Sequence, residues 1–135
     1  MITKGDDFPI HQTSSPIAEV GSERNFYDRY FFNGYNDDGS IFFGAAFCVY
    51  PNLNVKDASF IFVSKGIQHN FRYSDVLDYE RMETSVGSFK IEIIKPLKEI
   101  RITLNDEEKD INVDITFSRE IRTHGRTEND LKKWT

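Results

Sequence analysis

The chain has 135 residues, of which 39% are hydrophobic and 14% aromatic, and its formal net charge at pH 7 is -5. This length is typical of one globular domain with a single core. A nucleic-acid-binding groove needs a basic patch, which this acidic chain lacks. No segment approaches the roughly 20 apolar residues of a membrane-spanning helix, and residues 1–12 lack the apolar centre of a secretory signal peptide. We therefore expect a cytoplasmic protein.

Residues 1–24 show no sustained hydrophobic period, and prolines and glycines are spread among serine, threonine and aspartate. This composition predicts an extended arm, with a flexible tail as the alternative because chain termini are often disordered. Apolar side chains of the arm would otherwise lie in water. We expect them to pack along a sheet edge or to cap an open barrel end; they are Phe8, Ile10, Ile17 and Val20.

Two long strands, Phe26–Tyr35 and Ile41–Tyr50, flank the acidic turn Asn36–Ser40. The turn residues tolerate positive φ, which predicts a β-hairpin. Strands of antiparallel sheets usually alternate apolar and polar residues, but aromatic residues crowd both faces of this pair. On the first strand, one face carries Phe26, Tyr30 and Phe32, and the other carries Tyr27, Phe31 and Tyr35. We therefore expect both faces of the hairpin to be covered.

A clean alternation of apolar and polar residues follows this hairpin. Phe60 and Phe62 face one way, and after the turn at Lys65-Gly66 the alternation continues through Ile67, His69, Phe71 and Tyr73. The pattern predicts a second hairpin. The polar stretch Ser74–Ser85 is compatible with a short helical turn or with a long loop.

Three more apolar rows lie in the C-terminal part, within Phe89–Ile93, Ile100–Leu104 and Ile111–Phe117. The first two rows differ in phase. Between them, Lys95–Lys98 contains a proline, which cannot donate to a strand ladder, so we expect a turn, kink or bulge there. An acidic turn, Asn105–Asp110, precedes the third row.

Counting these segments gives about seven or eight antiparallel strands with short turns and no βαβ pattern. The prediction is an all-β fold, either a closed antiparallel β-barrel or a barrel-like sandwich. In this division, residues 1–24 form an N-terminal arm and residues 25–121 form the β-barrel domain. Residues 122–135 form a polar C-terminal segment or linker.

No histidine pair has the spacing of a local metal site, because His11, His69 and His124 lie far apart. His69 shares a row with apolar residues, so it is either a hydrogen-bonded core histidine or a polar group in an apolar cavity. Asp28 and Arg29 interrupt the aromatic strand. They are either rim charges or charges at the mouth of a cavity.

Other residue types with possible chemistry have ordinary structural interpretations. The acidic turns do not match the EF-hand calcium loop, so we interpret them as hairpin turns. Cys48 is the only cysteine, which excludes a disulfide or a thiolate metal site within one chain, and its place in an apolar strand indicates packing. No phosphate loop, nucleophile elbow or dinucleotide motif is present. The sequence therefore predicts no metal and no cofactor.

A family resemblance is carried by NFYDRYFFNGYNDDGSIFFGAAFCVYPN at residues 25–52 and FKIEIIKPLKEIRITLNDEEKDINVDITFSREI at residues 89–121. Together these segments resemble the N-terminal half of the two-domain lipocalin-like proteins grouped with AttH and with carotenoid hydratases of the hydroxyneurosporene-synthase type. The matching elements are the unit of strand, acidic Gly-containing turn and strand, and the Pro-Leu kink before a strand that ends in Asp-Ile-Thr-Phe. The resemblance covers Asp7 to Ile121.

The resemblance implies a calycin-type β-barrel, paired in the full protein with a second similar barrel, and a hydrophobic small-molecule ligand. In the hydratase branch the catalytic acid lies in the C-terminal half. The resemblance therefore places no catalytic residue in this chain.

Three hypotheses follow. The favoured one is a barrel domain that binds a hydrophobic small molecule without chemistry of its own, with a cavity near Tyr30, Phe32, Phe43, Phe47, His69 and Phe71. The second is a hydratase or isomerase that acts on an isoprenoid or steroid-like substrate, with Asp28 or His69 supplying a proton. The third is a structural half of a two-barrel protein, or a sugar-binding sandwich in which exposed coplanar aromatic rings replace a cavity. Because large apolar patches tend to find partners, we also expect a homo-oligomer or a second barrel domain.

Overall fold

A computed structural model describes residues 1–8, 22–78 and 82–119 of the chain. These residues form two four-stranded antiparallel sheets, with strand orders β1-β2-β3-β4 and β5-β6-β7-β8. They contain two short 3₁₀ helices and no α-helix. The prediction of an antiparallel all-β fold with seven or eight strands is therefore confirmed. In chain order the elements are η1 (Lys4–Asp7), β1 (Asp28–Tyr35), β2 (Ile41–Tyr50), η2 (Pro51–Leu53), β3 (Val55–Ser64), β4 (Ile67–Val76), β5 (Ser85–Val86), β6 (Phe89–Lys95), β7 (Glu99–Asp106) and β8 (Ile111–Ser118).

The first sheet consists of two hairpins whose turns follow from their local sequences. Between β1 and β2, the side-chain oxygen of Asn36 accepts a hydrogen bond from the backbone N–H of Ile41 at 2.8 Å, and Gly39 has a φ of 70°. Between β3 and β4, Lys65 and Gly66 have φ values of 51° and 74°, as in a two-residue type I′ turn. Both predicted hairpins are confirmed.

The second sheet is built from β6, β7 and β8, and the two-residue strand β5 adds an edge to it. Pro96 lies in the β6–β7 turn, where Leu97 has a φ of 57°. The pairing register also shifts between Ile93 and Lys95. The predicted phase break is therefore both a turn and a bulge. The sequence pattern does not predict β5, because two residues are too few to show a period.

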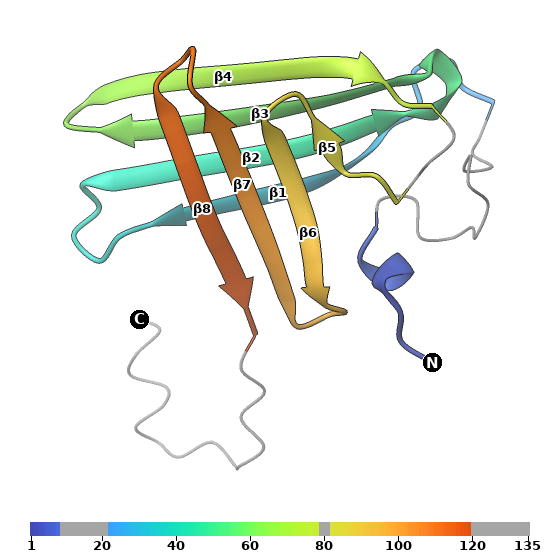
Figure 1. Cartoon of the computed structure of the whole chain (residues 1–135), viewed down its shortest axis with the longest axis horizontal. Coiled ribbons are helices and arrows are strands. Elements are labelled where there is room, and N and C mark those ends of the chain that lie inside the picture. The colour runs from blue at the N-terminus through green and yellow to red at the C-terminus, as the bar shows by residue number, and fades with distance from the viewer. Residues whose placement is uncertain (9–21, 79–81, 120–135) are drawn as a thin grey trace.

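The two sheets pack face to face and their strands cross steeply (Figure 1). No strand pairing joins the sheets within the described residues, so the fold is a barrel-like sandwich and not a closed barrel. Side chains from both inner faces meet in the centre. Those that are at most 1% exposed include Phe47, Phe60, Phe89, Ile102 and Leu104. Removing such side chains from water supplies most of the favourable free energy of folding.

The stretch Ser74–Ser85 forms no helix in its described residues. β4 continues to Val76, and the backbone N–H groups of Leu77 and Asp78 then each donate to Asn54 at 3.0 Å, to its carbonyl and its side-chain oxygen. These bonds hold Leu77 and Asp78 beside the start of β3, and Asp78 has a φ of 59°. The helical alternative is therefore wrong for these residues, and residues 79–81 lie outside the described part of the chain.

The described part of the N-terminal arm packs onto the domain. Phe8 is buried, and its ring meets the ring of Tyr30 edge to face, with centroids 6.5 Å apart. A carboxylate oxygen of Asp7 accepts a hydrogen bond from the backbone N–H of Leu97 at 2.6 Å. Packing of the apolar arm residues is thus observed at Phe8. The expectations for Ile10, Ile17, Val20 and residues 122–135 lie outside the described residues.

Candidate functional site

The strand register places the predicted ligand-binding residues on the inner face of the first sheet. Tyr30 is paired with Phe47, and side chains of directly paired residues point to the same face. One cross-strand row runs from Phe32 on β1 to Phe71 on β4, and the next runs from Gly34 through Phe43 to His69. All six predicted residues therefore share one face.

Two of these six residues lie deep in the sandwich. Phe47 is fully buried, and Tyr30 is 8% exposed. Their rings contact each other with centroids 6.3 Å apart, and both belong to the core cluster that includes Phe89 of the second sheet. A ligand would reach Tyr30 or Phe47 only by displacing other core side chains, so both residues contribute packing.

Three others take part in a set of partly exposed phenylalanines at one end of the sandwich. At this open end, the β1–β2 and β3–β4 turns extend beyond β8 (Figure 1). The ring of Phe117 on β8 lies 5.0 Å from that of Phe32 and 6.1 Å from that of Phe43, centroid to centroid. We call this set the phenylalanine cluster; its members are Phe32, Phe43, Phe62, Phe71 and Phe117, all partly buried.

Gly34 makes room for one ring of the phenylalanine cluster. A Cβ atom at this position would lie 2.5 Å from Cε1 of Phe43, well inside the van der Waals contact distance. Gly34 and Phe43 are directly paired across β1 and β2. The absence of a side chain at residue 34 therefore allows the Phe43 ring to lie over β1.

His69 is exposed, in contrast to the burial that its row predicts. The residue lies on the inner face opposite Phe62, but it is close to the β3–β4 turn, where β4 has passed the edge of the second sheet (Figure 1). The alternation of apolar and polar residues predicted the face of His69 correctly but predicted its burial incorrectly. His69 thus lies at the margin of the phenylalanine cluster and not within a core.

Asp28 and His69, the two groups considered as proton donors, lie far apart. Asp28 is paired with Val49 at the start of β1, whereas His69 belongs to the row of Gly34 near the end of that strand. A separation of six residues at about 3.3 Å per residue amounts to roughly 20 Å along the strand. The two side chains therefore cannot act together on one reacting bond.

The outer face of the same hairpin carries a second set of aromatic residues. Tyr27, Phe31, Tyr35 and Phe42 are 49%, 61%, 77% and 40% exposed. The guanidinium of Arg29 lies 5.8 Å from the ring centroid of Tyr27 and 5.7 Å from that of Phe31. Within the described residues only the inner face meets the second sheet, so a cover on the outer face of the hairpin stays a prediction.

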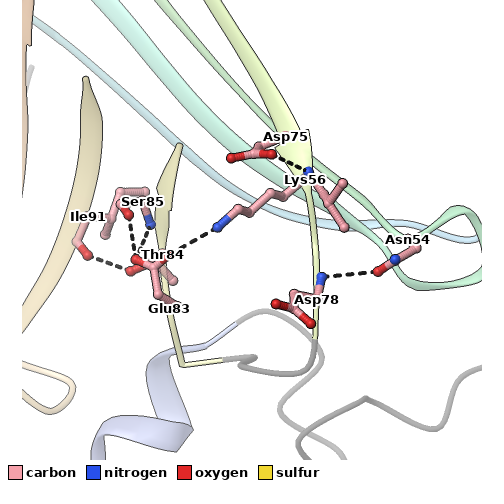
Figure 2. Close-up of polar contacts among 9 residues, drawn as sticks. Asn54, Lys56, Asp75, Asp78, Glu83, Thr84, Ser85 and Ile91 are labelled. Atoms are coloured by element: carbon pink, nitrogen blue, oxygen red, sulfur yellow. Dashed lines mark hydrogen bonds and ion pairs between the residues drawn. The ribbon is translucent and has the colours of Figure 1, made fainter. Parts of the chain in front are cut away.

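A buried lysine is a feature that the sequence analysis missed. Lys56 is 7% exposed, and its ammonium lies 3.0 Å from the carboxylate of Glu83 (Figure 2). Burial alone would raise the pKa of Glu83, but hydrogen bonds from Ser85 and Lys56 hold it below its ordinary value. The signal was available, since Lys56 has the same strand parity as the buried Ala58 and Phe60. We interpret the pair as a contact that fixes the segment entering β5.

A second polar contact joins the two sheets. The hydroxyl of Tyr73 on β4 donates to Oδ2 of Asp106 on β7 at 2.7 Å, and Nζ of Lys109 lies 3.0 Å from the same oxygen. These hydrogen bonds, first from Tyr73 and then from Lys109, lower the pKa of the Asp106 carboxyl. Burial, followed by the bond to Asp106, raises the pKa of Tyr73. Because each group has a partner of complementary chemistry, we interpret the contact as structural.

Cys48, Tyr50 and Asp57 lie together on the outer face, where Cys48 is paired with Asp57. Burial and then the negative charge of Asp57 raise the pKa of the Cys48 thiol. Burial also raises the pKa of Tyr50 to about 12, with contributions from Cys48 and Asp57. A thiol with a raised pKa is a poor nucleophile at neutral pH, which agrees with the packing role predicted for Cys48.

A hollow of about 390 Å³ lies beside β6. None of the predicted site residues lines it. Two of its lining residues, Phe8 and Met82, are adjacent in sequence to segments outside the described residues. We assign no function to it. Its lining consists of Lys4, Phe8, Met82, Glu83, Thr84, Lys90, Ile91, Glu92, Ile93 and Ile94.

Among the described residues, no group of three or more His, Cys, Asp or Glu side chains has the arrangement of a metal site. None of the helices in residues 1–8, 22–78 and 82–119 has the length and apolar character that crossing a membrane requires.

The fold and these surfaces define an all-β protein, a barrel-like sandwich of two four-stranded antiparallel sheets. A family of unknown function (DUF8625) matches residues 2–132, and the chain belongs to this family. No curated protein and no solved structure matches the chain.

Proposed function

We propose that this domain binds an apolar small molecule at the open end of the sandwich and has no catalytic chemistry of its own. The observation that carries the proposal is the phenylalanine cluster. Its five rings come from β1, β2, β3, β4 and β8, and all of them are partly exposed on the inner face. Residues from five strands thus converge on one apolar surface.

Burial energetics support a ligand at this place. Apolar surface gains roughly 25 cal/mol for each Å² removed from water, and the cluster is continuous with two exposed side chains of the same face, Ile41 and Ile67, at 39% and 59% exposure. Ligand sites are typically apolar with a few polar groups that fix orientation. His69 at the margin supplies such a group.

The resemblance to lipocalin-like proteins supports the same class of ligand, but the proposed position differs from a central barrel cavity. Phe47, Phe60 and Phe89 occupy the centre of the sandwich. The bound molecule would instead extend the core outward from the ring of Phe117. In this arrangement only three of the six predicted residues contact the ligand; these are Phe43, Phe71 and His69, with Phe32 beneath them.

The test combines ligand identification with a defined probe. Mass spectrometry of an organic extract of the purified protein identifies a retained apolar compound. Titration with the uncharged fluorophore N-phenyl-1-naphthylamine then measures binding. We expect saturable binding at one site, weakened about tenfold or more by Phe71→Ala, which corresponds to about 1.4 kcal/mol. Ile67→Asp, which changes an exposed residue at the same end, should weaken it without affecting the core.

Phe31→Ala is the matched control, because it removes an exposed phenylalanine from the other face of the same sheet. It should leave probe affinity unchanged. Circular dichroism and the urea midpoint verify that each variant folds. Absence of saturable binding, or an equal loss in Phe31→Ala, would contradict the proposal.

A further inference from the structure

The outer face of the first sheet carries a regular row of rings along β1. Tyr27, Phe31 and Tyr35 follow one another at intervals of four residues, so they point the same way, and each lies about 13 Å from the next along the strand. Arg29 is located between the first two rings and contacts both. All three rings are between 49% and 77% exposed. The ring of Tyr27 is stacked on that of Tyr50 with centroids 5.7 Å apart, so Phe31 and Tyr35 offer most of the aromatic surface to a ligand.

Small side chains lie next to this row, and polar ones lie beyond them. On β2 the outer face presents Gly44 and Ala46 between the larger Phe42 and Tyr50. The register then leads across β3 to exposed polar side chains of β4: Gln68, Asn70, Arg72 and Ser74. Between β2 and β4, the outer face of β3 carries the half-buried side chains of Ser59, Ile61 and Val63. One margin of the face therefore offers aromatic rings, and the opposite margin offers hydrogen-bond donors and acceptors.

We infer that this outer face binds a saccharide chain. Sugars make two kinds of contact, stacking and hydrogen bonding, and this face offers groups for the first at one margin and for the second at the other. Their C–H faces stack on aromatic rings, whose faces carry negative partial charge, and their hydroxyls exchange hydrogen bonds with amide and guanidinium groups. The inference is independent of the apolar site at the open end.

Other occupants fit this face less well. Stable protein interfaces concentrate their aromatic residues at the centre and polar ones at the rim, whereas here the aromatic rings follow one margin and the middle carries the half-buried aliphatic side chains of Ile61 and Val63. An apolar partner would also leave Asn70 and Arg72 desolvated, which is costly without new hydrogen bonds. Single-stranded nucleic acid also stacks on aromatic rings, but it needs a positively charged path. The carboxylate of Asp57 on this face and the net charge of -5 oppose the binding of a nucleic acid here.

The test is native affinity electrophoresis of the purified chain in gels that contain a soluble polysaccharide. Neutral probes are xylan, galactomannan and mixed-linkage β-glucan, and uronic acid probes are alginate and polygalacturonate. We expect retardation in at least one gel. Phe31→Ala and Tyr35→Ala should each reduce the affinity about tenfold or more, and Asn70→Ala should reduce it several-fold. Retardation only by the uronic acids, abolished by Arg72→Gln, would identify an acidic saccharide.

Ile94→Ala is the control, because it shortens an exposed apolar residue of the second sheet and should leave retardation unchanged. Three results would overturn the inference. They are the absence of retardation in every gel, unchanged retardation of the Phe31 and Tyr35 variants, and a concentration-dependent dimer that Phe31→Ala dissociates. The last result would assign the face to a second copy of the chain.

Discussion

The two faces of the β1–β2 hairpin carry similar numbers of aromatic residues but differ in what covers them. On the inner face, Tyr30 and Phe47 are buried against the second sheet, whereas on the outer face Phe31 and Tyr35 are 61% and 77% exposed. Composition alone therefore does not determine burial. The crossing position of the second sheet does, and it makes one face a core and leaves the other available for binding.

The largest effect should come from the centre of the covered face. Phe47→Ala removes a fully buried ring, and the loss of transfer free energy together with the cavity left behind should lower the free energy of unfolding by about 3–5 kcal/mol. Urea denaturation followed by circular dichroism measures this change. A loss below about 1 kcal/mol would mean that the two sheets do not pack as described.

An intermediate effect should come from the close approach between β1 and the phenylalanine cluster. In Gly34→Ala the new Cβ would lie 2.5 Å from the Phe43 ring, and overpacking of this kind costs about 1–3 kcal/mol. Gly44→Ala is the matched control on the outer face, where the nearest side-chain atom would lie at 3.9 Å. Equal urea midpoints for the two variants would show that the Phe43 ring is not held over Gly34.

A smaller effect should come from the polar contact between the sheets. Tyr73→Phe removes the hydroxyl that donates to Asp106 and should cost about 0.5–1.5 kcal/mol at pH 7, as is usual for one hydrogen bond. Measurement of the urea midpoint at pH 7 reports this loss. A variant as stable as the unmodified chain would indicate that the hydroxyl of Tyr73 makes no net contribution.

The same contact gives a pH dependence with a defined sign. Because the pKa of Asp106 is lowered in the folded state, the carboxylate contributes stability above its ordinary value of 3.8, and this contribution is lost as the pH falls through the lowered folded-state pKa. Stability of the unmodified chain should therefore decrease below about pH 4, and that of Tyr73→Phe should decrease less. Parallel acid titrations of the two proteins would argue against this assignment.

The smallest effect should come from the uncovered face. Phe31→Ala and Tyr35→Ala change exposed rings, and surface changes of this kind usually alter the free energy of unfolding by no more than about 0.5 kcal/mol. The comparison with Phe47→Ala uses the same residue type in the same hairpin. A loss of several kcal/mol in Phe31→Ala would show that another part of the chain covers the outer face.

Much of the fold was predictable from alternation and turn chemistry. The bounds of β2, the assignment of Tyr30 and Phe31 to opposite faces, and the irregularity at Lys95–Lys98 all follow from local sequence. These features depend on the period of two and on residues with positive φ, which are local properties.

The degree of burial of individual residues could not be predicted in the same way. His69 and Phe71 have the same parity on β4, yet His69 is exposed and Phe71 is half-buried, because the second sheet does not reach the end of the hairpin. The choice of covered face likewise depends on contacts between residues distant in sequence. The ion pair between Lys56 and Glu83 also joins distant segments, although the parity of Lys56 indicated its burial.

The order of the strands has a kinetic consequence. In both sheets every paired strand is the immediate neighbour of its partner along the chain, so each pairing closes only a short loop and costs little chain entropy. Hairpins form in about 1–10 μs, which is fast compared with most domain folding. The non-local event is the docking of one meander onto the other, which brings Phe47 and Phe60 against Phe89. Folding of this domain should therefore be limited by the meeting of two preformed sheets and not by strand pairing.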